Sequence, residues 1–328
     1  MLRSIYFANY RGKQIRPCNC YKALTNRIGL GNDMATKLFF LSDARSFSNA
    51  YRIAARVEPD YVIMLGDLLY DGSGQEYILD QASVAKVVKS CNNVRVYRLC
   101  NNTYLVRDYT STCKHIYDLH VTAFMDAIEK LILNGINVYI VIGNHDYEVN
   151  YQGLIIQHLG HGVAKKVTVV RRPLSIEIAG FTVLLLPYQP RIKYPRQLLC
   201  QSDIIATHAE LRQIRAIVGT LSTCDRVRLL VSGHWGVGYY PPDRLEQALV
   251  AGRIERNGHS KCYPKAITKT HLVRIDNFPY SYLAMQLNEN GKRISGRLKI
   301  IKRSLLLGPT CVDIIKKEHE YGFTIMMR

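Results

Sequence analysis

The sequence predicts an α/β fold, and three features of its pattern support this class. Short runs of apolar residues recur along the chain, and stretches with helical spacing separate several of them. Several of these runs end in Asp, Asn or His. Strands that alternate with helices favour a parallel sheet, and open α/β sheets bind ligands at the carboxyl ends of their strands.

The clearest of these runs is 137–146, which reads NVYIVIGNHD. It begins with β-branched residues, which are typical of a strand buried on both faces. The run stops at Gly143, and Asn144, His145 and Asp146 follow it. Gly and Asn also form ordinary turns after strands, so this stretch by itself supports a structural role as well as a functional one.

Two earlier strands are expected to form a βαβ unit. We predict a strand at 38–41 that leads to Asp43, a helix at 48–57, and a strand at 61–65 that leads to Asp67. Either Asp alone is typical of a turn or a helix cap. Together with the run at 137–146, they indicate several polar side chains at one edge of a sheet.

The remaining elements follow the same alternation, with one insertion. Residues 91–120 are polar and read as an insertion. Two further strands lead to His208 and His234, which adds two imidazoles to the expected edge. The predicted helices are at 75–89, 121–134 and 151–159, and a further helix follows His208 and ends near 221. A hairpin is predicted at 95–99 and 103–107, and strands at 166–171, 174–178, 181–186, 203–206 and 226–231.

The composition of the 328 residues is that of a globular protein with a basic surface. The net charge of +18 favours a polyanionic partner, and nucleic acid, DNA ahead of RNA, is the commonest. A basic surface that serves solubility is the alternative. No apolar run approaches the ~20 residues of a membrane span, so we expect no membrane association. The nine cysteines lack metal-finger spacing and predict reduced thiols in an intracellular compartment, cytoplasmic or nucleoid-associated.

Residues 1–37 are predicted to be a basic arm that contacts phosphates. They contain one acid, Asp33, and seven basic residues. An organelle transit peptide is the alternative, although the helical amphipathicity is poor. The basic residues are Arg3, Arg11, Lys13, Arg16, Lys22, Arg27 and Lys37.

Asp, Asn and His side chains at one sheet edge are the mixed oxygen and nitrogen ligands that Mn, Fe or Zn accept. Two such ions about 3.5–4 Å apart clamp a phosphate ester for attack by water. A nearby histidine that binds no metal can protonate the leaving oxygen.

At this point the motifs resemble a known family, the calcineurin-like metallophosphoesterases, and within it the SbcD-type DNA-repair nucleases and their phage relatives. The resemblance covers about residues 38–290. The residues that carry it are Asp43, Gly66-Asp67, Gly143–Asp146, His208 and Gly233-His234, with 181–188, Ser232–Trp235, 249–256 and 263–265 supporting the narrower match.

The resemblance implies a two-sheet β-sandwich flanked by helices over 38–290, and the many Lys and Arg residues beyond it predict a basic extension at 291–328. It implies that Asp67 bridges two metal positions and that His145 is the general acid, with Asp146 also in the catalytic group. Asp43 would serve the first metal, while Asn144, His208 and His234 would complete the second. The family's nucleases continue into a cap and a tail that binds a partner ATPase, and residues 291–328 leave little length for either.

Two positions depart from the family pattern, and both belong to the first metal. Arg45 and Gly236 stand where the family has histidines. The family motifs can also be aligned with His234 as the middle histidine and His259 in the final block. This alignment also lacks both histidine ligands of the first metal. We therefore expect one ion per chain, Mn²⁺ or else Fe or Zn, with the Arg45 guanidinium near Asp43 as a phosphate-binding group.

Two functions follow from these observations. The first is a divalent-metal phosphodiesterase, an SbcD-like DNA nuclease, which the intact second-metal residues favour. The second is a pseudoenzyme, a basic nucleic-acid-binding or structural component of a larger assembly, which Arg45, Gly236 and the charge of +18 favour. The retained polar positions place the enzyme slightly ahead.

Overall fold

We describe the fold from a computed structural model. The described residues are 35–43, 54, 56–69, 75–91, 94–99, 103–108, 114–190, 194, 196–234, 236–245, 269–275, 280–290, 292–307 and 312–327. Arg45, Trp235 and His259 lie outside them, as do residues 1–34 of the predicted arm and the segments 249–256 and 263–265.

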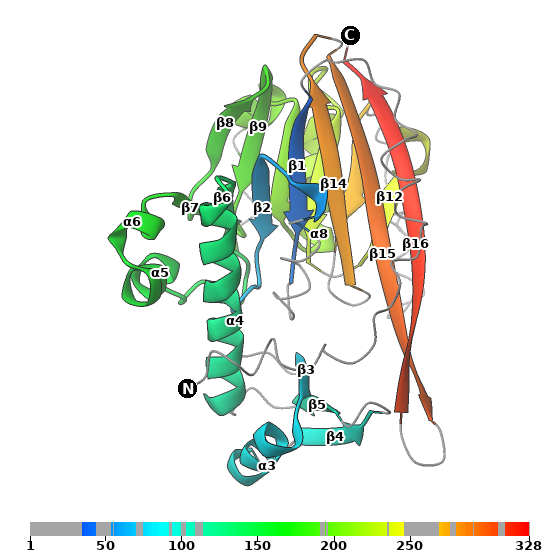
Figure 1. Cartoon of the computed structure of the whole chain (residues 1–328). Helices are drawn as coiled ribbons and strands as arrows, with labels where there is room; N and C mark the ends of the chain where they lie inside the picture. Colours follow the sequence, from blue (N-terminus) through cyan, green and yellow to red (C-terminus); the bar gives the residue numbers. More distant parts are fainter. Residues whose placement is uncertain are drawn as a thin grey trace. The chain divides into compact units, whose positions relative to one another are not determined.

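The chain has a mixed α/β fold with several sheets, which confirms the predicted class (Figure 1). The seven-stranded sheet has the order β16-β15-β14-β1-β2-β6-β7, and the six-stranded sheet has the order β12-β13-β11-β10-β9-β8. A three-stranded sheet has the order β3-β5-β4.

The bounds of the strands are as follows. The seven-stranded sheet contains β1 (Thr36–Leu41), β2 (Tyr61–Leu65), β6 (Asn137–Val141), β7 (Val167–Val170), β14 (Tyr280–Asn288), β15 (Arg293–Leu307) and β16 (Val312–Met326). The six-stranded sheet contains β8 (Leu174–Ile178), β9 (Phe181–Leu186), β10 (Ile204–His208), β11 (Leu229–Gly233), β12 (Gly238–Tyr240) and β13 (His271–Arg274). The small sheet contains β3 (Gln75–Leu79), β4 (Val94–Arg98) and β5 (Tyr104–Asp108).

The helices within the described residues are mostly short. They are α3 (Gln81–Ser90), α4 (Lys114–Leu133), α5 (Tyr151–Leu159), α6 (His161–Ala164), α7 (Arg196–Cys200) and α8 (Leu211–Leu221), with a 3₁₀ turn at Pro242–Arg244. None of them has the length and apolar character that a membrane crossing requires.

The two large sheets each contain a parallel block. Strands β1, β2, β6 and β7 pair in parallel with one another, and so do β9, β10, β11 and β13. All carboxyl ends of a parallel block lie at the same edge of its sheet. The polar residues that follow these strands are therefore brought to two sheet edges.

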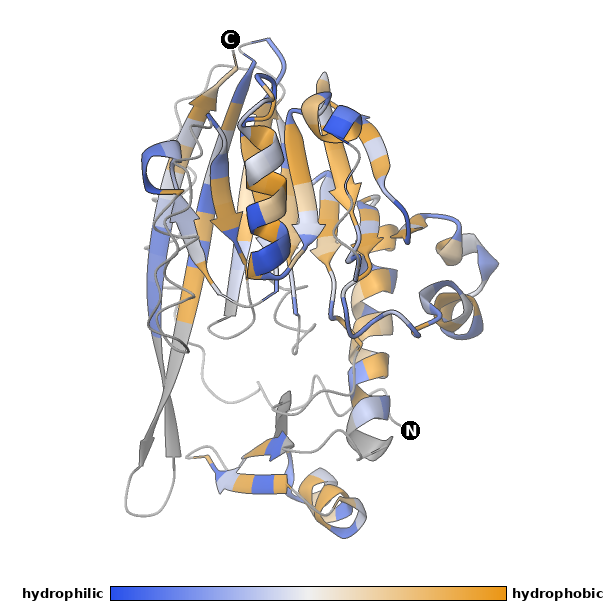
Figure 2. Cartoon of the chain, turned by 180° about the vertical axis from the view of Figure 1, so that it is seen from behind, coloured by the Kyte–Doolittle hydropathy of each residue, from blue (hydrophilic) through white to orange (hydrophobic). Residues whose placement is uncertain are grey.

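Alternation along β1 shows how the layers are built. Leu38 and Phe40 belong to a core that also contains residues of the six-stranded sheet, such as Val183. Phe39 and Leu41 belong to a second core, shared with α4 and α5. A third core lies between β10 and α8, where Ile205 and Ile217 are both buried. Strands that are covered on both faces are apolar at nearly every position, which explains the runs in the sequence and the orange strands in Figure 2.

The helix predicted at 75–89 starts later than expected. Residues 75–79 form β3 and not the start of a helix, because they pair with β5. The helix begins only after Asp80, whose carboxylate accepts a hydrogen bond of 2.7 Å from the Ser83 backbone N–H as an N-cap. The predicted hairpin is present as β4 and β5.

Residues beyond 290 continue the seven-stranded sheet. Strand β15 pairs antiparallel with β14, and β16 pairs antiparallel with β15. Ile294, Leu298 and Phe323 from this hairpin belong to the core between the two large sheets. The sheet that holds the candidate site residues therefore extends through the segment that the sequence analysis treated as an extension.

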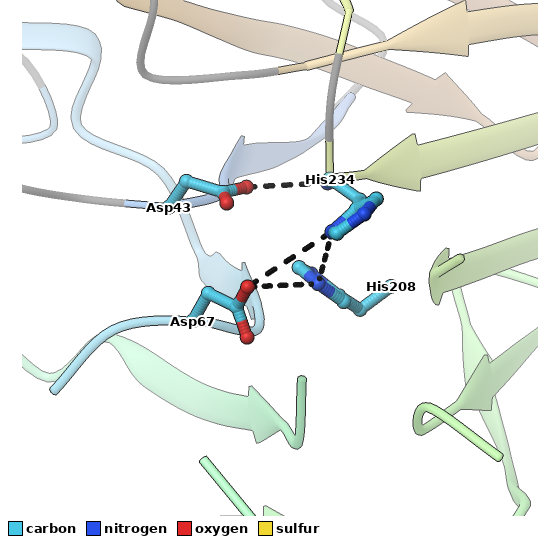
Figure 3. A group of neighbouring side chains, drawn as sticks. All are labelled: Asp43, Asp67, His208 and His234. Carbon is cyan, nitrogen blue, oxygen red and sulfur yellow. Dashed lines mark hydrogen bonds and ion pairs between the residues drawn. The ribbon is translucent and has the colours of Figure 1, made fainter. Parts of the chain in front are cut away.

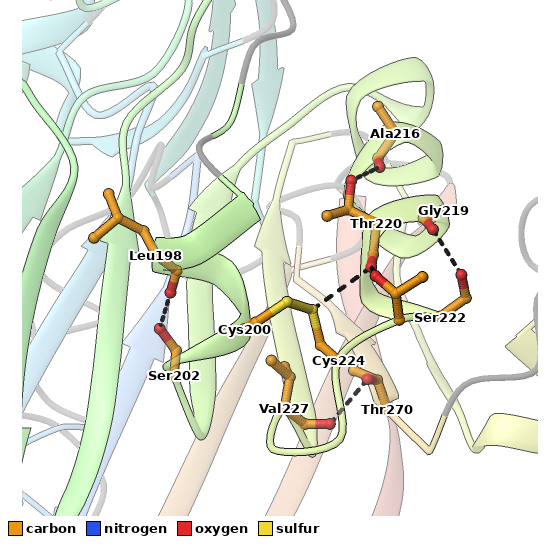
Figure 4. Close-up of a disulfide and its surroundings, with 11 residues drawn as sticks. Leu198, Cys200, Ser202, Ala216, Gly219, Thr220, Ser222, Cys224, Val227 and Thr270 are labelled. Atoms are coloured by element: carbon orange, nitrogen blue, oxygen red, sulfur yellow. Dashed lines mark hydrogen bonds between the residues drawn. A yellow bond between two sulfur atoms is a disulfide. The ribbon is translucent and has the colours of Figure 1, made fainter.

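The expectation of reduced thiols is wrong for Cys200 and Cys224. Cys200, at the end of α7, forms a disulfide with Cys224, with a Cα–Cα distance of 4.9 Å (Figure 4). Cys224 is buried in the core beneath α8. The bond joins two turns that are 24 residues apart in the chain, and no local pattern in the sequence pairs these two positions.

We expect replacement of both Cys200 and Cys224 by Ser to lower the free energy of unfolding of the oxidised protein by about 3 kcal/mol, because the bond closes a loop of this length in the unfolded chain. Urea denaturation measures the change. As the control, both proteins are also compared in the presence of a reductant, where the difference between them should disappear. Equal stability of the oxidised wild type and the oxidised double variant would contradict the prediction.

Candidate metal centre

Five strand ends supply the polar residues of the site. Asp43 follows β1, Asp67 follows β2 and Asn144 follows β6, all in the seven-stranded sheet. His208 ends β10 and His234 follows β11, both in the six-stranded sheet. The site therefore lies where the carboxyl edges of the two sheets meet.

The structure brings the predicted metal ligands together, and Figure 3 shows Asp43, Asp67, His208 and His234. One ligand atom from each of Asp43, Asp67, His208 and His234 lies within 4.8 Å of the others. The His208 Nε2 atom is 3.3 Å from Asp67 Oδ2, 3.0 Å from His234 Nδ1 and 2.9 Å from Asn144 Oδ1. The donor atoms thus converge on one point.

His208 is oriented for metal binding by its second nitrogen. Its Nδ1 atom is 2.8 Å from the Leu65 carbonyl oxygen, and the residue is fully buried. Because a carbonyl only accepts hydrogen bonds, Nδ1 must carry a proton and donate it. This bond turns Nε2 toward the cluster, as is usual for histidines that bind metals.

Asp146 holds the loops of the site and does not point into the cluster. Its fully buried carboxylate accepts hydrogen bonds from the backbone N–H groups of Asp67 at 2.5 Å, Leu68 at 3.0 Å and Gly143 at 3.1 Å. It also accepts a hydrogen bond of 2.7 Å from the Tyr151 hydroxyl. Burial and the charge of Asp67 raise the pKa of Asp146. Its geometry is that of a positioning residue that joins the ends of β2 and β6.

Glycines allow the strand ends to approach one another. A Cβ atom on Gly66 would lie 2.6 Å from Gly143 Cα and 2.7 Å from His208 Cγ. A Cβ atom on Gly233 would lie 2.5 Å from the Leu65 carbonyl oxygen. Real Cβ atoms do not come this close, so a larger residue would push the two sheet edges apart.

Three of the cluster residues have a left-handed backbone. Asp43, Asp67 and His234 have φ values of 50°, 53° and 79°. Non-glycine residues pay about 1–2 kcal/mol for this conformation, and such strain gathers at functional sites. Hydrogen bonds hold it in place: the Asp43 N–H donates to Gly66 O at 3.0 Å, and the His234 N–H donates to Asp43 Oδ2 at 3.2 Å.

The charges of the cluster are coupled. Burial disfavours a charged imidazole at His208, but the hydrogen bond to Asp67 and its charge raise the pKa of His208 to about 9. Burial would raise the pKa of Asp67, yet the hydrogen bond and charge of His208 outweigh it and lower that pKa. Burial and the charge of His208 lower the pKa of His234 to about 4. In the metal-free protein, a proton on His208 therefore balances the Asp67 carboxylate.

The other predicted residues lie around the cluster or outside the described part. The His145 side chain is exposed, while its backbone N–H donates to Asp67 Oδ1 at 2.9 Å. Gly236 supplies no ligand, and the Arg274 guanidinium lies where a side chain at 236 would project. Sequence reasoning did not single out Arg274, because it stands in no motif.

The donor set fits one divalent cation. Ligand atoms about 2.1 Å from a common ion are at most about 4.2 Å apart, which is close to the 4.8 Å span of the cluster. Carboxylate, imidazole and amide donors suit Mn, Fe or Zn. Asp43, Asp67, Asn144, His208 and His234 would hold it.

No protein-family model matches the chain, and no curated protein matches it at a significant level.

We expect Gly66→Ala to unfold the protein far more readily than Gly135→Ala. Both glycines have positive φ values, 69° and 75°, but a Cβ atom at Gly135 meets nothing within 4 Å. Gly135→Ala should cost about 1 kcal/mol for backbone strain alone, and Gly66→Ala at least about 3 kcal/mol because strand ends must also separate. Chemical denaturation measures both, and equal losses would show that the strand ends are not tightly packed.

Metal binding to the metal-free protein should release a proton. A nitrogen that binds a metal must be unprotonated, so the cation displaces the proton of His208. Because the pKa of His208 is about 9, affinity should rise about tenfold per pH unit from about pH 6.5 to 8.5, and the stability from the His208–Asp67 pair in the metal-free protein should fall over the same range. Calorimetry in buffers of different ionisation enthalpy counts the protons. An affinity that does not change with pH would contradict this charge assignment.

Proposed function

We propose that this protein is a divalent-cation-dependent phosphodiesterase of the calcineurin-like metallophosphoesterase type. The observation that carries the proposal is the convergence of Asp43, Asp67, His208 and His234 within 4.8 Å, with Asn144 on the same imidazole nitrogen. Two carboxylates, two imidazoles and an amide from five strand ends form a donor set for a metal. A purely structural ion pair requires only two of these groups.

The order of the elements supports the family assignment. Within the described residues, each predicted metal ligand stands at or after the end of a strand in a parallel block, and helices cover the outer faces of both large sheets. Glycine is required at three motif positions for a physical reason. Gly66, Gly143 and Gly233 all stand where the backbone comes too close to its neighbours for a side chain. The motifs therefore agree with the packing as well as with the spacing in the chain.

The chain's own residues would act around the substrate as follows. When bound, a divalent cation polarises a phosphoryl oxygen and lowers the pKa of water. The His145 side chain is exposed beside Asp67, where it can reach the leaving oxygen and donate a proton. Asp146 would hold the backbones of Asp67 and Gly143 in position through its hydrogen bonds and would not touch the substrate.

A single cation per chain is the favoured stoichiometry. All predicted ligands surround one point, and Gly236 has no side chain to hold a second ion. The net charge of +18 favours a nucleic acid as the substrate, and DNA remains the first expectation. The second candidate function is a nucleic-acid-binding or structural pseudoenzyme, which the missing ligand at Gly236 favours because one cation activates water less than two.

Metal analysis of the protein dialysed against Mn²⁺ should find one ion per chain, and bound Mn²⁺ should raise the melting temperature. Asn144→Ala should weaken Mn²⁺ binding about tenfold or more, since one ligand is lost. Asn137→Ala is the matched control, because Asn137 is exposed at the opposite end of β6.

The same proteins then separate the two functions. Mn²⁺-dependent cleavage of DNA or of a nitrophenyl phosphodiester that disappears in Asn144→Ala and persists in Asn137→Ala supports the enzyme. Binding of Mn²⁺ and DNA without cleavage supports the pseudoenzyme. Failure of the wild type to bind any of Mn²⁺, Fe²⁺ or Zn²⁺ would end the proposal of a metal centre.

A further inference from the structure

Arg274 lies at the same sheet edge as the metal centre. It is the last residue of β13, which pairs in parallel with β11 and places Arg274 opposite Ser232. His234 follows Ser232 by two residues, and β12 passes on the other side, with Gly238 opposite Arg274. The arginine is half-buried between these strands.

The loop after His234 leaves room for the guanidinium. A Cβ atom on Gly236 would lie 2.8 Å from Arg274 Nη1 and 2.9 Å from both Cζ and Nη2. Gly236 also has a φ of 105°, which side-chain-bearing residues rarely adopt. A residue larger than glycine would therefore displace the guanidinium from this position.

Arg274 adds a positive charge to the strand that pairs with the one leading to His234. With a divalent cation bound, the carboxylates of Asp43 and Asp67 balance the ion. The guanidinium then leaves a net positive charge beside the cation, which matches the single negative charge of a phosphodiester.

We infer that Arg274 is an anion-binding residue of this centre, which holds a non-bridging oxygen of a phosphate ester beside the bound cation. This inference rests on the proposed function and deepens it. A guanidinium presents parallel N–H groups that match two phosphate oxygens, so Arg274 selects phosphate esters and positions them for the cation. The second positive group of the site is then an arginine in place of a second metal.

Inorganic phosphate is the probe, and calorimetry on the Mn²⁺-loaded protein is the measurement. Arg274→Ala should weaken phosphate binding about 10- to 100-fold, the usual effect of losing a charge-assisted pair of hydrogen bonds. Its Mn²⁺ affinity should be unchanged or tighter, since a neighbouring positive charge is removed. Arg274→Lys should recover part of the phosphate affinity.

Arg228→Ala is the matched control. Arg228 is also half-buried, and it lies just before β11, at the opposite edge of the same sheet, where its carbonyl accepts a hydrogen bond from the His271 N–H. It should keep wild-type phosphate affinity, which excludes a general effect of charge. Gly236→Ala keeps the guanidinium but displaces it and should also weaken phosphate binding. Melting curves establish that each variant is folded, and Arg274→Gln replaces Arg274→Ala if the latter does not fold.

The outcomes separate this inference from the proposed function. If the wild type binds Mn²⁺ but not phosphate, or if Arg274→Ala binds phosphate as the wild type does, the role of Arg274 is overturned and the metal centre stands. Equal losses in Arg228→Ala and Arg274→Ala also overturn it. If the wild type binds none of Mn²⁺, Fe²⁺ and Zn²⁺, the proposed function fails and this inference fails with it.

Discussion

The close approach of strand ends from two sheets is the constraint on which the site depends. Gly66 and Gly143 touch across β2 and β6, and Gly233 brings β11 against Leu65. The Leu65 carbonyl also accepts the hydrogen bond that orients His208. The Leu65 carbonyl thus contacts both sheets. Its position decides whether the side chains of His208 and Asp67 can bind the same metal ion. The contacts that pack the two sheet edges together are therefore the same contacts that orient the candidate ligands.

The buried carboxylate of Asp146 explains how the loops stay in this arrangement. Backbone N–H groups at the end of a strand have no ladder partner and are costly to bury unpaired. Asp146 satisfies those of Asp67, Leu68 and Gly143 at once. With its hydrogen bonds in place, the left-handed backbone of Asp67 is held by its surroundings and not by its own preference.

The elements that the sequence predicts well are the strands whose own run of apolar residues identifies them. The strands before Asp43, Asp67 and Asn144 are covered on both faces, so nearly every residue is apolar and each strand can be recognised without its neighbours. Asp43, Asp67 and Asn144 stand after such strands, so parallel pairing brings these three to one edge of the seven-stranded sheet.

Features decided by distant contacts could not be read in the same way. Strand β3 pairs with β5, and Cys200 meets Cys224 because the turns that follow α7 and α8 lie side by side. The role of Asp146 depends on which N–H groups surround it, although it belongs to the most readable motif of the chain. Arg274 has no motif at all, and only the register of β13 against β11 places it at the site.

The electrostatics explain how such a site can be stable before a metal binds. Two buried carboxylates at close range repel each other, and burial adds to the cost. Asp43 accepts hydrogen bonds from the Ser42 hydroxyl and the His234 N–H, while Asp67 is balanced by the proton of His208. A divalent cation would replace that proton and would balance both carboxylates. The metal-free site is therefore already folded around a positive charge, and metal binding exchanges one cation for another without rebuilding the sheet edges.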